Sequence, residues 1–183
     1  MKKLLRIKSF TLIELMVVIA IIAVLAVIIA PQALKAVEKA RISAVLGDYQ
    51  AIKTGAFSFN ADTATWPAND CGEESFTTND NCSGGTYTGW AGPYLEKWPN
   101  VARWQGSEVY WCKVTSAAIS PCEAWNTDAS DEERYIRITN VPLTSAQRLD
   151  EQVDGSPADG TADWVRYTTG SSTTTLRILV SED

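Results

Sequence analysis

The sequence predicts an α+β fold, in which a long N-terminal α-helix packs on an antiparallel β-sheet. An apolar run near the N-terminus continues into an amphipathic helical pattern, and four short segments rich in β-branched and aromatic residues follow later in the chain. A chain of 183 residues, 45% of them apolar, has the length of one globular domain and enough apolar residues for a core.

The first half of the predicted helix is apolar enough to cross a membrane. Leu15 to Ala30 are sixteen consecutive apolar residues, and an extension back to Phe10 adds only two polar residues, Thr11 and Glu14. A helix over residues 10–30 is about 32 Å long, close to the thickness of the hydrocarbon core of a bilayer. A carboxylate such as Glu14 is costly to bury there, so we expect it to need a charged partner.

Beyond Pro31, which we expect to kink or locally unwind the helix, the pattern becomes amphipathic. Apolar residues recur at alternating spacings of three and four and form one stripe, which we expect to pack against a globular head: Ile42, Val45, Tyr49, Ile52, Ala56 and Phe59. The helix is expected to run from Phe10 to about Asn60.

A polar segment over residues 60–92 is predicted to be a long loop, and it contains Cys71 and Cys82. A second pair, Cys112 and Cys122, follows. Neither spacing is the Cys-x-x-Cys of redox or zinc sites, so we expect two disulfides, as in exported domains. Three pairings are open, and we favour Cys71–Cys82 with Cys112–Cys122 because local loops close easily.

Four β-strands and one short helix are predicted after this loop. The strands are Val109–Thr115, Arg134–Thr139, Trp164–Thr169 and Thr174–Val180, with a hairpin at residues 170–172 between the last two. The residues from Thr144 to Gln147 fit a capping box, which would begin a helix that ends near Val153.

Composition and charge exclude several functions. The chain has no His, which excludes Ser-His-Asp and Cys-His catalysis and His-ligated zinc. The net charge of −6 argues against nucleic acid as the main partner, because phosphate contacts need clustered Lys and Arg. With no phosphate-binding loop and no nucleophile motif, we predict that the protein is not an enzyme. The basic residues in the first nine positions predict a cytoplasmic N-terminus.

An acidic stretch near residue 155 is the one candidate for a cofactor. Oxygen ligands in a glycine-containing segment suit Ca²⁺, although the spacing is not that of an EF-hand. We prefer a solvated acidic turn and keep Ca²⁺ as the alternative, with these residues as its ligands: Asp150, Asp154, Asp159 and Asp163.

The residues from Ser9 through Phe10, Thr11 and Glu14 into the apolar run resemble the N-terminus of type IV pilins and type II secretion pseudopilins. The resemblance implies that prepilin peptidase cuts between Ser9 and Phe10 and that Phe10 is then N-methylated. Ser9 stands where the family strongly prefers Gly. The resemblance further implies that Glu14 pairs with the N-terminal amine of an adjacent subunit in a helical filament. Pro31 falls where the family often has a proline.

The resemblance also implies the division of the chain and its location. The predicted segments are a leader over residues 1–9, a transmembrane and filament-core helix over 10–31, an amphipathic helix over 32–60 and a globular head over 61–183. A single-pass protein of the inner membrane is implied before assembly, with an assembly platform and a motor as partners. The segment that contains Gly92-Pro93-Tyr94-Leu95 is similar to one found in major pseudopilins and some pilins.

Three functions remain open within this resemblance. The first is a structural subunit of a type IV pilus-like filament at the cell surface. The second is a pseudopilin of a type II secretion system, which would act in the periplasm. The third is a minor tip pilin that acts as an adhesin, with Trp-lined loops as its binding surface.

Overall fold

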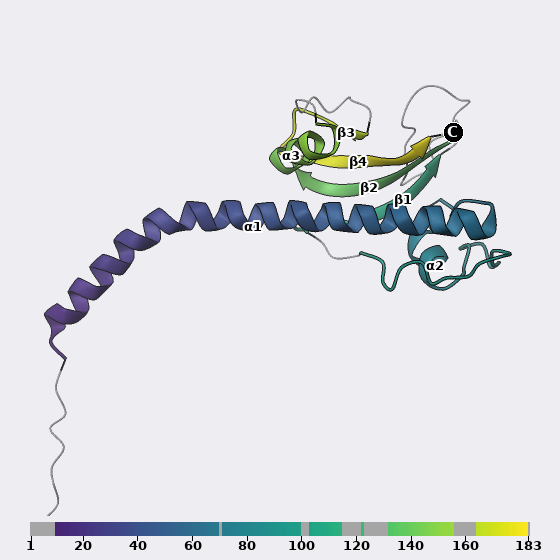
Figure 1. Cartoon of the computed structure of the whole chain (residues 1–183). Coiled ribbons are helices and arrows are strands. Elements are labelled where there is room, and N and C mark those ends of the chain that lie inside the picture. The colour runs from purple at the N-terminus through teal and green to yellow at the C-terminus, as the bar shows by residue number, and fades with distance from the viewer. Residues whose placement is uncertain are drawn as a thin grey trace, which may run out of the picture. The chain divides into compact units, whose positions relative to one another are not determined.

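The computed structural model describes residues 10–69, 71–99, 103–114, 122, 132–155 and 164–182. The chain divides into two compact units, residues 1–40 and 41–183, here the N-terminal and the C-terminal unit. The elements, labelled in Figure 1, are α1 (Leu12–Thr63), α2 (Gly72–Thr77), β1 (Val109–Val114), β2 (Glu133–Pro142), α3 (Leu143–Asp154), β3 (Val165–Tyr167) and β4 (Thr173–Glu182). The predicted α+β fold, a long helix with an antiparallel sheet, is confirmed.

Within the N-terminal unit, the described residues form one helix. Pro31 lies inside α1 and the helix continues on both sides of it, so of the two expected effects, a kink or local unwinding, the unwinding does not occur. A proline inside a helix removes one amide donor, but the turns on either side keep their own hydrogen bonds.

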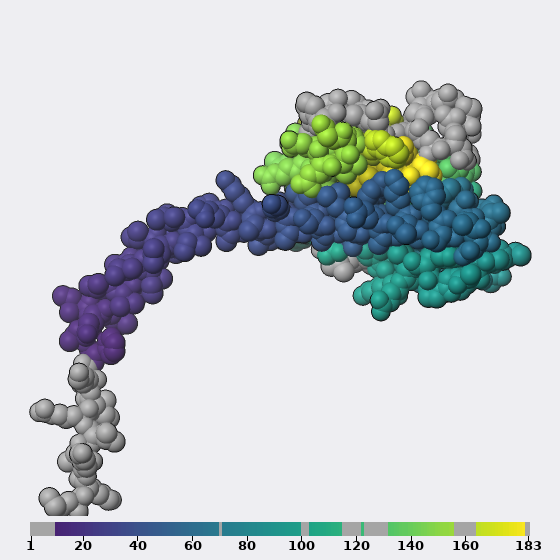
Figure 2. Space-filling view, in the orientation of Figure 1, coloured from purple at the N-terminus to yellow at the C-terminus, as the bar shows by residue number. Residues whose placement is uncertain are grey.

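In the C-terminal unit, α1 buries one face. The predicted stripe is confirmed, with Gly55 added and Tyr49 half-buried at its margin: Ile42, Val45, Ile52, Gly55, Ala56 and Phe59 are buried. The Tyr49 hydroxyl donates a hydrogen bond to the Leu179 carbonyl oxygen at 2.8 Å, which joins α1 to β4. Figure 2 shows this part of α1, in blue, with the sheet residues on one side and the α2 region on the other.

The sheet has four antiparallel strands in the order β1-β2-β4-β3, so β2 and β4 are central and β1 and β3 are the two edges. β2 and β4 extend beyond their predicted bounds because they pair with each other from Glu133↔Glu182 to Pro142↔Thr173. β3 is shorter than predicted and pairs with β4 at three positions. The predicted hairpin between these two strands is confirmed, and Gly170 in its turn has a φ of +98°.

The predicted long loop over residues 60–92 is interrupted by α2, which the sequence did not reveal. Phe76 of α2 is fully buried, and its ring stacks on that of Trp98 at 5.9 Å. The Phe76 ring also meets the edge of the Trp111 ring at 5.5 Å. Since Trp111 lies on β1, α2 closes the core at that edge of the sheet.

The helix α3 begins two residues earlier than predicted and without the predicted capping box, which has Thr144 as its N-cap. Its N-cap is Pro142, which has no side-chain hydrogen bond to the helix. The Leu143 amide instead donates to the Ser172 carbonyl oxygen at 3.1 Å, so the hairpin turn satisfies a free amide of the first turn. Gly155 ends α3 in the left-handed conformation.

Candidate functional site

A continuous apolar surface covers α1 from Leu15 to Ala30. Every residue from Phe10 to Val37 is exposed, including side chains as large as Phe10, Met16 and Ile22. By length and composition, α1 is able to cross a membrane. A monomeric soluble protein rarely exposes an apolar surface of this extent, so this segment needs a membrane or other protein chains to cover it.

At the start of α1, Thr11 and Glu14 form a capping box. The Thr11 amide and hydroxyl both donate to Glu14 Oε2, at 3.2 and 2.9 Å. The Glu14 amide donates to Thr11 Oγ1 at 3.2 Å. Two amides of the first turn are thereby satisfied, and the carboxylate lies at the positive end of the helix. Among the described residues, both bonds that Glu14 accepts go to Oε2, and Oε1 accepts none.

Sequence reasoning identified Glu14 but missed the role of Thr11. The pattern Thr-x-x-Glu directly before an apolar run is the signal that would have found it. Phe10 immediately precedes this capping box and is exposed. Ser9, the other residue of the predicted cleavage site, lies outside the described residues.

Both disulfides have the expected pairing. Cys71 and Cys82 are joined with their Cα atoms 5.9 Å apart, and Cys112 and Cys122 with theirs 5.5 Å apart. Cys71 directly precedes α2, so the first disulfide holds the start of that helix. Cys112 lies on β1, and both members of the second disulfide are fully buried.

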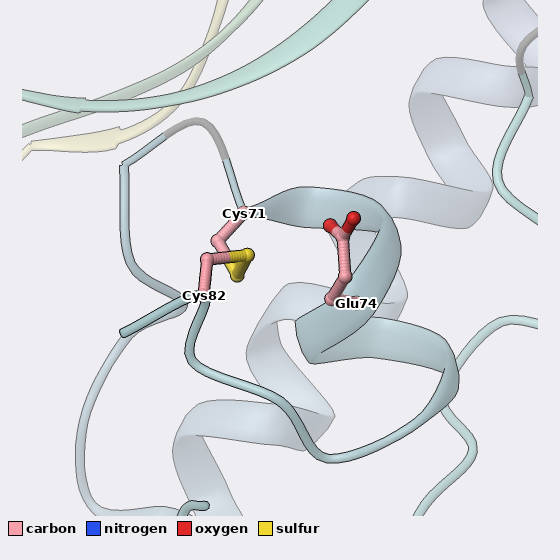
Figure 3. A group of neighbouring side chains, drawn as sticks. All are labelled: Cys71, Glu74 and Cys82. Atoms are coloured by element: carbon pink, nitrogen blue, oxygen red, sulfur yellow. A yellow bond between two sulfur atoms is a disulfide. The ribbon is translucent and has the colours of Figure 1, made fainter. Parts of the chain in front are cut away.

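Glu74 lies beside the first disulfide, and its carboxylate is within 4.8 Å of the Cys71 and Cys82 sulfur atoms (Figure 3). Such a group of one carboxylate and two sulfurs would suit a soft metal ion if the cysteines were thiolates. Because the two sulfurs are bonded to each other, they supply no thiolate ligand. The arrangement is therefore a disulfide with an acidic neighbour.

The Gly92-Pro93-Tyr94-Leu95 segment fastens the end of α1 to α2. The Tyr94 and Leu95 amides both donate to the Phe76 carbonyl oxygen, at 2.8 and 3.3 Å. The Tyr94 hydroxyl donates to Asp62 Oδ2 at 2.8 Å, and Gly92 precedes a cis proline. Gly55 of α1 faces this segment, since a Cβ there would lie 3.4 Å from the Tyr94 carbonyl oxygen.

Two of the four candidate calcium ligands come together on α3. Asp150 is 1% exposed and Asp154 is half-buried one turn later, so the expected solvated turn is wrong for these two residues. Burial, together with the neighbouring Asp150 carboxyl group, raises the pKa of Asp154 above its usual value. Asp154 Oδ2 accepts a hydrogen bond from the Val165 amide at 3.3 Å. Asp159 and Asp163 lie outside the described residues.

Comparison with known families agrees with the resemblance of the N-terminus. Residues 5–30 match the family model described as the prokaryotic N-terminal methylation motif, which includes both Phe10 and Glu14. Residues 36–118 match the model described as PilW, C-terminal. Both matches are consistent with a type IV pilin-like protein. No curated protein and no solved structure matches it.

This similarity gives the site its context. The methylation motif of the pilin-like protein implies processing by prepilin peptidase and a role in pilus assembly. The motif and the apolar helix together indicate a membrane-anchored protein. Domains of the pilin family are structural rather than enzymatic. The second matched region runs from α1 to just beyond β1, so it includes the first disulfide and the Gly92–Leu95 segment.

Proposed function

We propose that this pilin-like protein is a minor subunit of a type IV pilus-like filament, processed before Phe10 and assembled through α1. The single observation that carries this proposal is the exposed apolar surface of α1, which begins with a capped Glu14. The match to the PilW model favours a minor pilin over a pseudopilin. The filament would lie at the cell surface, after an inner-membrane stage that involves an assembly platform and a motor.

Glu14 has the geometry that an assembly contact needs. One carboxylate oxygen is held by Thr11, which fixes the side chain at the first turn of the helix. Cleavage before Phe10 would create a free amine one residue before Thr11. The amine of a neighbouring subunit would then pair with Oε1, and this pairing would compensate for the loss of water around a buried charge.

The capping box allows a substitution that separates the charge of Glu14 from its capping role. Glu14→Gln keeps a side-chain oxygen for the Thr11 amide but removes the negative charge. We expect this variant to remain in the membrane and to be absent from sheared filaments. Thr11→Val is the matched control, because it removes the hydroxyl and leaves the charge. We expect this control to assemble.

The test is N-terminal sequencing and intact-mass analysis of the membrane fraction and of filaments sheared from cells. The proposal expects methylated Phe10 at the N-terminus, and a small amount of the protein in sheared filaments beside a more abundant subunit. Assembly of Glu14→Gln at the wild-type level would refute the role of the charge. A processed chain found only in the cell envelope would support the pseudopilin alternative, and binding of glycans through an exposed Trp would support a tip adhesin.

The Asp150–Asp154 pair supports a second, accessory proposal, a Ca²⁺ site. The Asp154 Oδ1 atom is buried and accepts no hydrogen bond from a described residue. A buried carboxylate oxygen without a donor suits a hard cation, and both carboxylates lie one helical turn apart. Such a site would stabilise the C-terminal unit and would have no catalytic role.

A further inference from the structure

A groove in the C-terminal unit runs along α1, beside β3, β4 and the end of α3. It consists of two hollows, of about 590 Å³ and about 360 Å³, which share Lys53 and Trp164 in their linings. On α1 this groove, here the aromatic groove, extends from Leu46 to Phe57, which is about 16 Å of helix. Its length suits an extended ligand rather than a single small molecule.

Two exposed aromatic side chains line the aromatic groove. Phe57 and Trp164 are 46% and 42% exposed, and no other large apolar side chain in the described part of the C-terminal unit is exposed to this extent. Both residues are nevertheless held in place. The Phe57 ring meets the edge of the Trp66 ring at 5.5 Å, and the Trp164 carbonyl oxygen accepts a hydrogen bond from the Leu179 amide at 2.8 Å. Aromatic rings that are exposed and already fixed are able to bind a ligand at a low entropic cost.

The positive charge of Lys53 lies beside one of these rings and is not neutralised. Its ammonium group donates to the Tyr49 hydroxyl at 3.3 Å and lies 4.9 Å from the centre of the Trp164 ring. Neither contact carries a negative charge, and no salt bridge joins Lys53 to a described residue. The ammonium group is therefore positioned to meet the carboxylate of a ligand with little loss of side-chain entropy.

The other polar side chains of the aromatic groove supply both donors and acceptors of hydrogen bonds. Gln50 and Gln152, which are both exposed, line the hollow beside α3. Arg166 and Ser181 line the hollow beside β3 and β4. An amide side chain both donates and accepts, and a hydroxyl does the same, whereas Lys and Arg only donate. A ligand that is rich in hydroxyl groups matches such a mixture.

Exposed rings, amides and one cation together match the surface of an acidic sugar. One face of a sugar ring carries C–H groups, which pack on an aromatic ring, and its edge carries hydroxyl groups, which bond to amides. A carboxylate on the sugar would pair with Lys53. A protein partner fits less well, because Lys and Ser are depleted at the centre of protein interfaces, whereas Lys53 lies where the two hollows meet.

We infer that the aromatic groove binds an acidic glycan, with sugar rings stacked on Trp164 and Phe57 and a carboxylate paired with Lys53. This inference rests on the proposed function and deepens it, because it gives a minor filament subunit a ligand. The whole groove is formed by one chain, so a single copy in a filament is sufficient for binding. A subunit that is present in few copies suits such a role in recognition.

The test is NMR titration of sugar probes with the purified full-length chain, in micelles of a detergent that has no sugar headgroup. The acidic probes are sialyllactose and tetragalacturonate, and the methyl ester of each is its neutral counterpart. We expect an acidic probe to bind at least about fivefold more tightly than its methyl ester, because only the acid offers a carboxylate to Lys53.

Two positions in the groove separate stacking from charge. Trp164→Ala should weaken binding of the acidic probe at least about fivefold, and Trp164→Phe, which keeps a ring, should weaken it less. Lys53→Gln should remove the preference for the acid over its methyl ester, since it removes the charge and keeps a hydrogen-bond donor. Lys97→Gln, on an exposed residue outside the groove, is the matched control and should bind as the wild type does.

Tetraglutamate, which has carboxylates but no sugar ring, tests whether the groove instead prefers an acidic protein segment. Binding of tetraglutamate as tight as that of the acidic sugars would overturn the inference, as would unchanged binding by Trp164→Ala. A chain that is found in sheared filaments but binds neither acidic probe would overturn the inference alone and leave the proposed function standing. A chain that binds an acidic probe but is absent from filaments would refute the proposed function and support the glycan site.

Discussion

The two units use the same helix in opposite ways. Before residue 38, apolar residues occupy all faces of α1 and none is buried, whereas after residue 41 they are confined mainly to one face, and that face is buried. The composition changes as well, since residues 15–30 are all apolar, whereas polar residues such as Asp48, Gln50 and Lys53 alternate with apolar ones after residue 41. An apolar stripe on a mixed helix therefore marks a surface that the chain covers itself, and an unbroken apolar run marks one that it leaves for other molecules.

The largest expected effect on stability is that of shortening a buried isoleucine of α1. An exposed isoleucine of the same helix gives the comparison. Ile52→Ala should lower the free energy of unfolding by about 2–5 kcal/mol, because Ile52 is fully buried against the sheet. Ile21→Ala should change it by less than about 0.5 kcal/mol, because Ile21 is exposed. Denaturant unfolding of the full chain in detergent micelles, followed by Trp fluorescence, measures both. Equal losses would contradict the difference between the units.

Removal of either disulfide should give the next largest loss of stability, and the two losses should differ. Each closes a loop of similar length, which by chain entropy is worth about 2–4 kcal/mol. Cys112→Ser/Cys122→Ser should cost more than Cys71→Ser/Cys82→Ser, because both members of the second disulfide are buried while Cys82 is exposed. Thermal unfolding of the two double variants compares them, and a larger loss at Cys71 and Cys82 would contradict this order.

Tyr94→Phe should have a smaller effect, about 0.5–1.5 kcal/mol, because it removes the hydroxyl that bonds Asp62 and the Ala91 amide. The control is Thr54→Val, whose hydroxyl donates to the Gln50 carbonyl oxygen four residues away within α1. That contact joins no separate parts of the chain, so its loss should leave the midpoint of unfolding nearly unchanged. A control that is as destabilised as Tyr94→Phe would show that Tyr94 does not hold the end of α1.

The smallest expected effect is a pH dependence from Asp154. Because the pKa of Asp154 is raised in the folded state, the folded chain binds a proton at this residue more readily than the unfolded chain does. Stability should therefore rise as the pH falls from above the raised pKa toward the usual value for Asp, about 3.9. Asp154→Asn should raise stability at neutral pH and weaken this dependence, as measured by thermal unfolding across a pH series.

Glu151→Gln, on an exposed residue of the same helix, is the control and should keep the pH dependence of the wild type. Added Ca²⁺ provides the test of the accessory site. A rise in the unfolding temperature with Ca²⁺ that disappears in Asp154→Asn would support a bound cation. No effect of Ca²⁺ on either protein would refute the site.

The sequence was sufficient where a pattern repeats and insufficient where a contact is distant. The stripe from Ile42 to Phe59 and the four strands follow from periodicity and residue type, and local loop closure was enough to choose the disulfide pairing. The six residues of α2 are too few to show a period, and α2 is held by contacts of Phe76 with Trp98 and Trp111. The Tyr94–Asp62 bond joins residues 32 positions apart, so no local signal predicts it.

The strand order also determines when the protein is able to fold. β4 pairs with both β2 and β3 and carries Leu179, whose carbonyl oxygen binds Tyr49 of α1 across 130 positions in the sequence. β4 is synthesised after every other element described, so the centre of the sheet stays unpaired until then. If α1 enters the membrane during synthesis, export of the remaining chain precedes completion of the core. A chain that ends before residue 173 would lack β4 and leave β2 and β3 without their common partner.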